Sequence, residues 1–399
     1  MTGPARVVVI GGGHAGFHVG LFLRSGAWAG DVTLVEAQAG LPYQRPPLSK
    51  DFLAGKQELD DTLFRPASFY ADSGIELVRG RAVAAIERST GEVVLSDGAR
   101  LPYDHLVLAT GSRPRPLAVP GADLDGVVHL ATGHDAEVLR DRINRARRVA
   151  VLGGGFIGLE TAAVAASAGR TVTVFEAADR LMSRVVSEPM SRYFEQLHRA
   201  HDVNVLLSTP VARIEGTDGR VSAVLAADGT RVRADLVVVG IGAVPNDELA
   251  ASAGLDTANG VLVDSTLRTG DPRISAIGDC ARFVSRFAAD TPNLRLESVQ
   301  NAADQARFVA GVITETAGAP GYDAVPWFWT DQFGSKLQIA GLVAGYERID
   351  REHDAEDRFS LNCYRGDLLL GSESVNSPRE HLRARRRLAA ALERGVAPR

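Results

Sequence analysis

Two glycine-rich loops, each placed between an apolar strand and an apolar helix, limit what this chain can fold into more than any other feature. The first is GGGHAG at residues 11–16, and the second is GGGFIG at residues 153–158. In both cases the helix is followed by a second apolar strand that ends in an acid, Glu36 or Glu176. Strand, glycine turn, helix and terminal acid together form the pattern of a dinucleotide-binding unit, so we expect two such units.

Each glycine has its own role in this pattern. The first permits the tight turn, the second lets a pyrophosphate approach the main chain, and the third lets the helix pack closely on the strand. The phosphates then lie on free N–H groups at the helix N-terminus, and the acid accepts hydrogen bonds from the adenosine ribose. For either loop alone, a purely structural turn is the alternative. Two dinucleotides in one chain indicate that one reduces the other by hydride transfer.

The acid of the second unit also bears on the choice of nucleotide. A carboxylate at Glu176 repels a 2′-phosphate, which predicts NADH rather than NADPH at this site. Arg180 lies four residues further on and is able to weaken this preference. The alternative interpretation is an acid that is merely exposed at a strand end.

Composition excludes several other classes of function. A net charge of −5 argues against a nucleic-acid-binding protein, and no apolar run reaches the roughly 20 residues of a membrane-spanning helix. The two cysteines, Cys280 and Cys363, lie far apart, which argues against a dithiol relay and a zinc site, and the nine histidines show no metal-ligand spacing. We therefore expect a cytoplasmic protein with no metal site and with neither a nucleic-acid nor a membrane partner.

The length of 399 residues fits two or three domains. We expect an α/β fold with two Rossmann-like dinucleotide-binding domains and a C-terminal α+β domain. The first domain is expected to be discontinuous, because residues 261–279 read as its continuation after the second unit. The expected bounds are 1–113 and 247–322 for the first domain, 114–246 for the second and 323–399 for the third.

Two helices are expected beyond the nucleotide units. One begins near Ser298 and ends near Glu315, and a basic one extends from Arg383 to Arg394. The arginines at positions 383, 385, 386 and 387 suggest a docking surface for an acidic protein partner. A solvated helix face is the simpler interpretation of the same cluster.

Five short segments resemble a known family of enzymes. They are PYQRPPLSK (42–50), ATG (109–111), AIGD (276–279), ESVQNA (297–302) and VPWFWTDQ (325–332). With the two glycine loops, they make nearly the whole chain similar to the FAD-dependent pyridine nucleotide reductases. More narrowly, the chain resembles the NADH-dependent ferredoxin reductases of bacterial oxygenase systems. Related disulfide and peroxide reductases carry redox cysteines near the first flavin helix, where this chain has none.

The resemblance implies binding roles for individual residues. The start of the helix expected near Ser298 would lie at the flavin pyrimidine edge, where its partial positive charge stabilises the anionic reduced flavin. The residues expected to contact FAD are Gly11, Gly13, Ala15, Gly16, Glu36, Arg45, Pro46, Lys50, Val83, Ala109, Thr110, Gly111, Asp279, Ser298, Val299, Gln300 and Trp329. Those expected to contact NADH are Gly153, Gly155, Phe156, Ile157, Gly158, Glu160, Glu176, Arg184 and Gly242.

A catalytic group is implied as well, with Lys50 beside the flavin N5, Glu160 as its ion-pair partner and Trp329 near the nicotinamide. Judged from the residues alone, Lys50 is a solvated surface charge and Glu160 is an acid that complements the helix dipole from the first turn. Two positions depart from the family pattern. Ala131 replaces a frequent arginine, so one phosphate contact is expected to be absent, and Thr330 replaces a common serine.

The activity implied by the resemblance is that of an FAD-dependent NADH:ferredoxin reductase. It passes hydride from NADH to FAD and single electrons to a small 2Fe–2S ferredoxin that serves an oxygenase, either a haem-thiolate monooxygenase or a Rieske dioxygenase. Alternatives are rubredoxin reduction, reduction of a small molecule such as a quinone, and an NADH-gated signalling flavoprotein like apoptosis-inducing factor. We expect a monomer or a weak homodimer.

Overall fold

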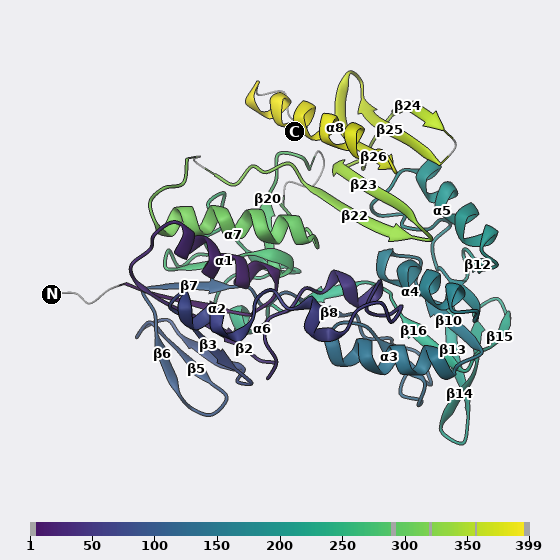
Figure 1. Cartoon of the computed structure of the whole chain (residues 1–399), viewed down its shortest axis with the longest axis horizontal. Helices are drawn as coiled ribbons and strands as arrows, with labels where there is room; N and C mark the ends of the chain where they lie inside the picture. Colours follow the sequence, from purple (N-terminus) through teal and green to yellow (C-terminus); the bar gives the residue numbers. More distant parts are fainter. Residues whose placement is uncertain (1–4, 289–292, 319–320, 356, 395–399) are drawn as a thin grey trace.

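The computed structural model describes residues 5–288, 293–318, 321–355 and 357–394. Three five-stranded sheets organise these residues (Figure 1). Two of the sheets are parallel and alternate with helices along the chain, as in Rossmann-like domains, and the third is antiparallel and is covered by the last helix. The fold class expected from the sequence is therefore confirmed.

The first parallel sheet has the strand order β19-β7-β1-β2-β3. Its central strand is buried on both faces, since Val7, Val8 and Val9 are each at most 2% exposed, which is typical of a strand covered by helices on both sides. Helices α1 and α7 pack against each other (Figure 1). The elements are Arg6–Ile10 (β1), His14–Ser25 (α1), Asp31–Glu36 (β2), Ile75–Arg79 (β3), His105–Leu108 (β7), Ile274–Ala276 (β19) and Val299–Ile313 (α7).

The second parallel sheet has the order β12-β11-β10-β16-β9. Its elements are Val127–His129 (β9), Gly133–Arg145 (α3), Arg148–Leu152 (β10), Phe156–Ser167 (α4), Thr171–Phe175 (β11), Glu188–Ala200 (α5), Asn204–Leu206 (β12) and Leu236–Val239 (β16).

The two parallel sheets share one plan but are completed differently. Strands β10, β11, β12 and β16 hold the same places as β1, β2, β3 and β7. The strand beside β16 is β9, which precedes β10 in the chain, whereas the strand beside β7 is β19, which comes only after the whole second unit. The first unit is thus completed by a late segment of the chain.

Smaller elements connect the units. Each unit has a three-stranded antiparallel sheet before its fourth strand, and the strands β8 and β17 pair where the chain passes between the units. These elements are Val83–Glu87 (β4), Glu92–Leu95 (β5), Arg100–Pro102 (β6), Ser112–Pro114 (β8), Val211–Thr217 (β13), Arg220–Ala226 (β14), Arg231–Arg233 (β15) and Ala243–Pro245 (β17). The remaining ones before the third sheet are Pro46–Ser49 (η1), Leu59–Thr62 (η2), Ala67–Asp72 (α2), Glu248–Ser252 (α6), Val261–Leu262 (β18), Gly278–Cys280 (η3), Ala281–Val284 (β20) and Asn293–Leu294 (β21).

The antiparallel sheet has the order β22-β23-β26-β25-β24, and α8 packs on β23 and β26. The basic helix begins at Pro378 rather than at Arg383, because proline is well tolerated at the first position of a helix, where its missing N–H has no intrahelical partner to lose. The elements are Trp327–Gln332 (β22), Ser335–Gly341 (β23), Arg348–Ala355 (β24), Arg358–Arg365 (β25), Leu368–Val375 (β26) and Pro378–Glu393 (α8).

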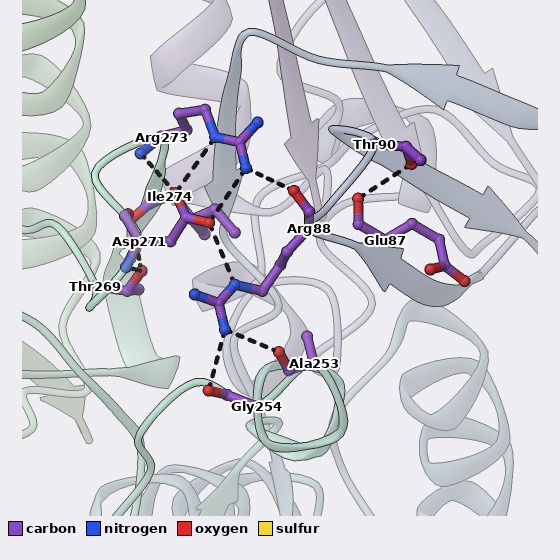
Figure 2. Close-up of polar contacts among 9 residues, drawn as sticks. All are labelled: Glu87, Arg88, Thr90, Ala253, Gly254, Thr269, Asp271, Arg273 and Ile274. Atoms are coloured by element: carbon purple, nitrogen blue, oxygen red, sulfur yellow. Dashed lines mark hydrogen bonds and ion pairs between the residues drawn. The ribbon is translucent and has the colours of Figure 1, made fainter.

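An ion cluster around Asp271 fastens the late segment of the first unit to the early one (Figure 2). Asp271 is 7% exposed, and its carboxylate lies 3.2 Å from Arg88 Nε and 3.4 Å from Arg273 Nη2. Arg88 also donates to the carbonyls of Ala253 and Gly254. Burial opposes the charge of Asp271, but hydrogen bonds from Arg273 and Arg88 outweigh it and hold its pKa below the usual range. The cluster therefore joins two segments that the second unit separates in sequence.

A buried carboxylate joins the third sheet to the second unit. Glu373 on β26 is fully buried, and it accepts hydrogen bonds from both the backbone N–H and the hydroxyl of Ser187, the residue before α5. Burial raises the pKa of Glu373 to about 7, although the hydrogen bonds from Ser187 and the charge of Arg180 oppose the shift. The contact is therefore sensitive to pH near neutrality.

We expect Glu373 to make the protein less stable as the pH rises from about 4.5 to about 7. In this range the folded protein holds a proton on Glu373 that the unfolded chain, with the ordinary pKa of 4.5, has released, so raising the pH favours unfolding. Relative to Glu373→Gln, which cannot ionise, the wild type should lose up to about 1.4 kcal/mol per pH unit. Urea unfolding of both proteins at several pH values across this window measures the difference.

The matched control is Glu347→Gln, which removes an exposed carboxylate of the same sheet domain and should keep the wild-type pH dependence. A wild type that gains stability relative to Glu373→Gln over the window would contradict the prediction, because it would mean that Ser187 holds the buried carboxylate in its ionised form.

Candidate functional site

Both glycine loops open into one large cleft of about 1830 Å³ that extends from the first nucleotide unit to the second. The proline-rich segment around η1, the start of α7 and the first residues of β22 complete its lining. The cleft therefore brings together the two nucleotide units and the third sheet, which are far apart in sequence.

The first glycine of each loop is required by backbone geometry. Gly11 has φ +108° and Gly153 has φ +103°, a conformation that other residues rarely adopt. A Cβ at Gly11 would lie 2.3 Å from the carbonyl oxygen of Ala109, and one at Gly153 would lie 2.4 Å from that of Gly240. The close approach of the next strand end therefore excludes any side chain at these two positions.

The third glycine of each loop serves packing. A Cβ at Gly16 would lie 1.8 Å from the carbonyl oxygen of Gly11, and one at Gly158 would lie 2.2 Å from that of Gly153. Neither glycine lines the cleft. Their role is the close contact of helix and strand that the pattern predicts, rather than contact with a ligand.

The two strand-end acids are held in the same way. Glu36 accepts a hydrogen bond from the N–H of Gly12 at 2.8 Å, and Glu176 accepts one from the N–H of Gly154 at 2.6 Å. Each also accepts a second bond from the N–H two residues beyond itself. Both acids line the cleft, so they are more than exposed strand ends.

The N-termini of α1 and α4 are open toward the cleft. Among the described residues no side chain caps either helix, and neither helix has an acid in its first turn. The residues before them, Gly13 and Gly155, have extended backbones, and a Cβ would meet no atom within 4 Å at Gly13 and only Gly240 O, at 4.0 Å, at Gly155. N–H groups without side-chain partners, in open space at a helix N-terminus, fit the pyrophosphate of a dinucleotide.

Asp279 lies at the carboxyl end of β19, where it lines the cleft. Ser112 donates a hydrogen bond to its carboxylate at 2.9 Å. Burial raises the pKa of Asp279 above its usual range, Glu297 adds to the shift, and the bond from Ser112 opposes it. A carboxylate in this setting gains from a further donor such as a sugar hydroxyl.

Helix α7 begins at the cleft as expected. Ser298 caps it by accepting a hydrogen bond from the N–H of Asn301, and the Ser298 hydroxyl donates to the carbonyl of Trp327 at 2.8 Å. Val299 lines the cleft, but Gln300 does not, because its side chain donates to Asp304 at 2.8 Å.

Lys50 and Glu160 form an ion pair in which the glutamate is buried and the lysine is partly exposed. The distance from Lys50 Nζ to Glu160 Oε2 is 2.7 Å, and the two side chains are 20% and 4% exposed. Ser49 donates its hydroxyl to Oε2 at 2.5 Å, and Thr330 donates to Oε1 at 2.6 Å. Lys50 is therefore not a solvated surface charge, and Glu160, the fifth residue of α4, stands in the second helical turn rather than the first.

The proline-rich loop reaches Glu160 because its apolar side chains pack on the second unit. Leu48, Phe52 and Leu53 are at most 3% exposed and belong to the core that includes α3 and α4. The hydroxyl of Tyr43 accepts a hydrogen bond from the N–H of Gly133 at the start of α3. These contacts fix η1, whose prolines favour the helical turn that presents Lys50.

Aromatic side chains form the wall of the cleft on the side of the third sheet. Trp327 and Trp329 line it, with ring centroids 5.6 Å apart. Arg385 of α8 lies over the ring of Trp327 at 4.7 Å. Its neighbours Arg383 and Arg387 contact Glu380 and Tyr364, so most of the predicted arginine cluster is engaged within the chain.

Of the predicted site residues, all but Gly16, Gly158 and Gln300 line the cleft. Their assignment to particular cofactor atoms stays a prediction. Ala131 also lines the cleft, as expected from its family position. Sequence reasoning missed Ser49 and Ser112, and it noted Thr330 only as a substitution. The proximity of Ser49 to Lys50 in sequence was the available signal.

The remaining sequence expectations concern cysteines, metals and membranes. Cys280 and Cys363 are free and buried, and burial raises the pKa of both thiols. Within the described part of the chain, no cluster of potential ligands has metal-site geometry. No helix among the described residues combines the length and the apolar character needed to cross a bilayer.

Comparison with known proteins gives matches along the chain. A family model for pyridine nucleotide-disulphide oxidoreductases matches residues 5–306, and a reductase C-terminal model matches residues 327–397. Rhodocoxin reductase of Rhodococcus erythropolis is 48% identical, over 97% of this chain and 90% of that protein. The ferredoxin reductase for the CYP199A2 system of Rhodopseudomonas palustris has a TM-score of 0.91 and 44% identity, over 94% of this chain and 92% of its own.

A second solved structure shows such a reductase with its partner. Putidaredoxin reductase, in its covalent complex with putidaredoxin, has a TM-score of 0.92 and 41% identity, over 96% of this chain and 93% of its own. These matches confirm the resemblance drawn from the sequence motifs.

Proposed function

This chain belongs to the pyridine nucleotide-disulphide oxidoreductase family, and from this premise we propose that it is an FAD-dependent NADH:ferredoxin reductase. The observation that carries the proposal is a single cleft into which two open dinucleotide loops face, with a lysine–glutamate ion pair in its lining. The electron acceptor proposed is a small 2Fe–2S ferredoxin that serves an oxygenase, in line with the names of the relatives.

FAD is proposed to bind the first unit. The open N-terminus of α1 would hold its pyrophosphate, Glu36 its ribose and Asp279 its ribityl chain. The N-terminus of α7, with Val299 in the cleft, directs partial positive charge toward the place where negative charge develops. When bound, FAD supplies the ability to accept a hydride and to release electrons one at a time.

NADH is proposed to bind the second unit, with Glu176 facing the adenosine ribose. The sequence alone allows Arg180 to weaken the preference for NADH, but in the structure its guanidinium group is engaged elsewhere. Arg180 Nη1 donates to the carbonyl of Val186 and to the hydroxyl of Ser191, and Nη2 donates to the carbonyl of Ser183. Reaching a 2′-phosphate would break all three bonds, so Arg180 supports the choice of NADH by being unavailable.

We expect kcat/KM to be at least roughly tenfold higher with NADH than with NADPH, because Glu176 repels a 2′-phosphate and Arg180 is held by its three hydrogen bonds. Glu176→Gln keeps the shape and removes the charge, so the ratio should fall toward one. The control is Glu36→Gln, the equivalent change in the other unit, assayed with saturating FAD. Equal efficiency of the wild-type protein with both nucleotides would refute the assignment.

The Lys50–Glu160 pair is proposed to act on the hydride transfer step. Lys50 would hold its positive charge beside the flavin N5, and Glu160 fixes the direction of that charge because its carboxylate is itself held by Ser49 and Thr330. Charges fixed in a site of low polarity act more strongly than mobile charges in water.

Lys50→Met should slow NADH-driven flavin reduction by roughly tenfold or more, because it removes a fixed charge at the reacting ring. Stopped-flow absorbance of the FAD-loaded protein measures the rate. Lys56→Met is the matched control, since Lys56 is 72% exposed and forms an ion pair with Asp51 at 3.5 Å, outside the Lys50–Glu160 pair. An unchanged rate in Lys50→Met would remove Lys50 from the catalytic group.

Reduction of cytochrome c by NADH, with and without an added 2Fe–2S ferredoxin, tests the proposed acceptor. A large ferredoxin-dependent increase is expected, because a ferredoxin would accept single electrons from the reduced flavin and pass them on to cytochrome c. Rapid flavin reduction without such an increase for any ferredoxin tried would favour a rubredoxin or a small molecule such as a quinone.

A further inference from the structure

A chain of buried hydrogen bonds leads from Glu160 away from the cleft. Thr330 Oγ1 lies 2.6 Å from Glu160 Oε1, and Gln332 Nε2 lies 3.0 Å from Thr330 Oγ1. Gln332 Oε1 in turn lies 2.8 Å from Nε2 of His198, on helix α5. Thr330, Gln332 and His198 are each at most 1% exposed, so the chain connects the cleft to the interior between β22 and α5.

Only one arrangement of protons satisfies this chain when Glu160 is the anionic partner of Lys50. A carboxylate can only accept, so Thr330 must donate to it. The Thr330 oxygen is then free to accept from the amide nitrogen of Gln332, which turns the amide oxygen toward His198. His198 must therefore carry its proton on Nε2. The charge of Glu160 thus determines the tautomer of His198, to which it is connected by three hydrogen bonds.

The surroundings of His198 keep it neutral and confined. Burial lowers its pKa to about 4, although the bond to Gln332 opposes the shift, and His201 contributes to the lowering. Its Nδ1 is buried with no hydrogen-bond partner among the described residues, and its ring makes an edge contact with Phe333, with centroids 5.0 Å apart. The neutral imidazole of His198 therefore acts as a hydrogen-bond donor, from Nε2 to Gln332.

We propose that Gln332 and His198 are positioning residues that hold Glu160, through Thr330, in the orientation that fixes Lys50. The proposal rests on the proposed catalytic role of the Lys50–Glu160 pair. A polar chain in a buried interface is costly unless every member is satisfied, and apolar residues would fill the same space at lower cost. The series of hydrogen bonds ends at Glu160, the carboxylate that pairs with Lys50. Its polar groups therefore orient this carboxylate as well as filling the interior.

The tautomer of His198 tests the proposed series of hydrogen bonds by a measurement that does not depend on enzyme activity. Nitrogen-15 NMR of histidine-labelled protein should show His198 as a neutral imidazole protonated at Nε2, its signal being assigned by its loss in His198→Gln. Thr330→Val, which breaks the link to Glu160, should shift that signal. A His198 protonated at Nδ1, or a signal that Thr330→Val leaves in place, would overturn the inference.

Kinetics test whether the chain positions the pair. Gln332→Met keeps the length of the side chain and removes both bonds, and it should slow NADH-driven flavin reduction roughly three- to tenfold. His198→Leu should do the same, and His198→Gln, which retains a donor, should restore the rate. Tyr193→Phe is the control, because Tyr193 also joins α5 to the third sheet, through Ser335 at 3.1 Å, but the described hydrogen bonds do not connect it to Glu160.

The outcomes separate this inference from the proposed function. If Lys50→Met is slow while folded Gln332→Met and His198→Leu reduce flavin at the wild-type rate, the chain is structural and the inference is wrong. If Tyr193→Phe is slowed equally, general loosening of α5 explains the effect, and the inference is again wrong. If Lys50→Met itself is fast, the catalytic role of the pair fails, and the inference fails with it.

Discussion

The carboxylate of Glu160 is the point on which the rest of the site depends. It lies on α4 of the second unit, and it accepts bonds from Ser49 and Lys50 of the proline-rich loop and from Thr330 of the third sheet. Ser49 lies 111 residues from Glu160 in the sequence, and Thr330 lies 170 residues from it. Since removing one partner of a buried charge costs far more than removing an exposed one, the site forms only when all three parts of the chain are in place.

The duplicated units explain why this junction occurs once. Both loops have the same first-glycine conformation, the same packing glycine and the same acid bonded to the second glycine. The units differ in what packs on the helix after the loop: α7 covers α1, whereas η1 and β22 contact α4. At the fifth helical position the first unit has His18 and the second has Glu160. The two units thus share one backbone plan, and the ion pair forms only where Glu160 and the neighbours of α4 come together.

Sequence predicted best what depends on neighbouring residues. The glycine loops, the terminal acids and the start of α7 follow from local geometry, so their patterns were sufficient. The bonds of Gln332 and His198 were not predictable, because they join residues 134 apart through packing that no local pattern encodes. The prediction that Gln300 lines the cleft was wrong for a similar reason, since its side chain donates a hydrogen bond to Asp304 instead. The domain bounds, the cytoplasmic location and the oligomeric state stay predictions.

The absence of a dithiol follows from the kind of acceptor proposed. A disulfide substrate needs a nucleophilic thiol in the site, but Cys280 is fully buried, and its thiol donates to the carbonyls of Leu108 and Ile277. Transfer of single electrons to a protein carrier forms no covalent bond, so it requires only a close approach and a suitable electrostatic setting. Under the proposed function, Lys50 and the aromatic wall lie where hydride would reach the flavin, and the later transfer of electrons to the carrier needs no cysteine. The proline-rich loop is therefore proposed to place a fixed charge at the flavin, and it does not have to supply a thiol for the acceptor.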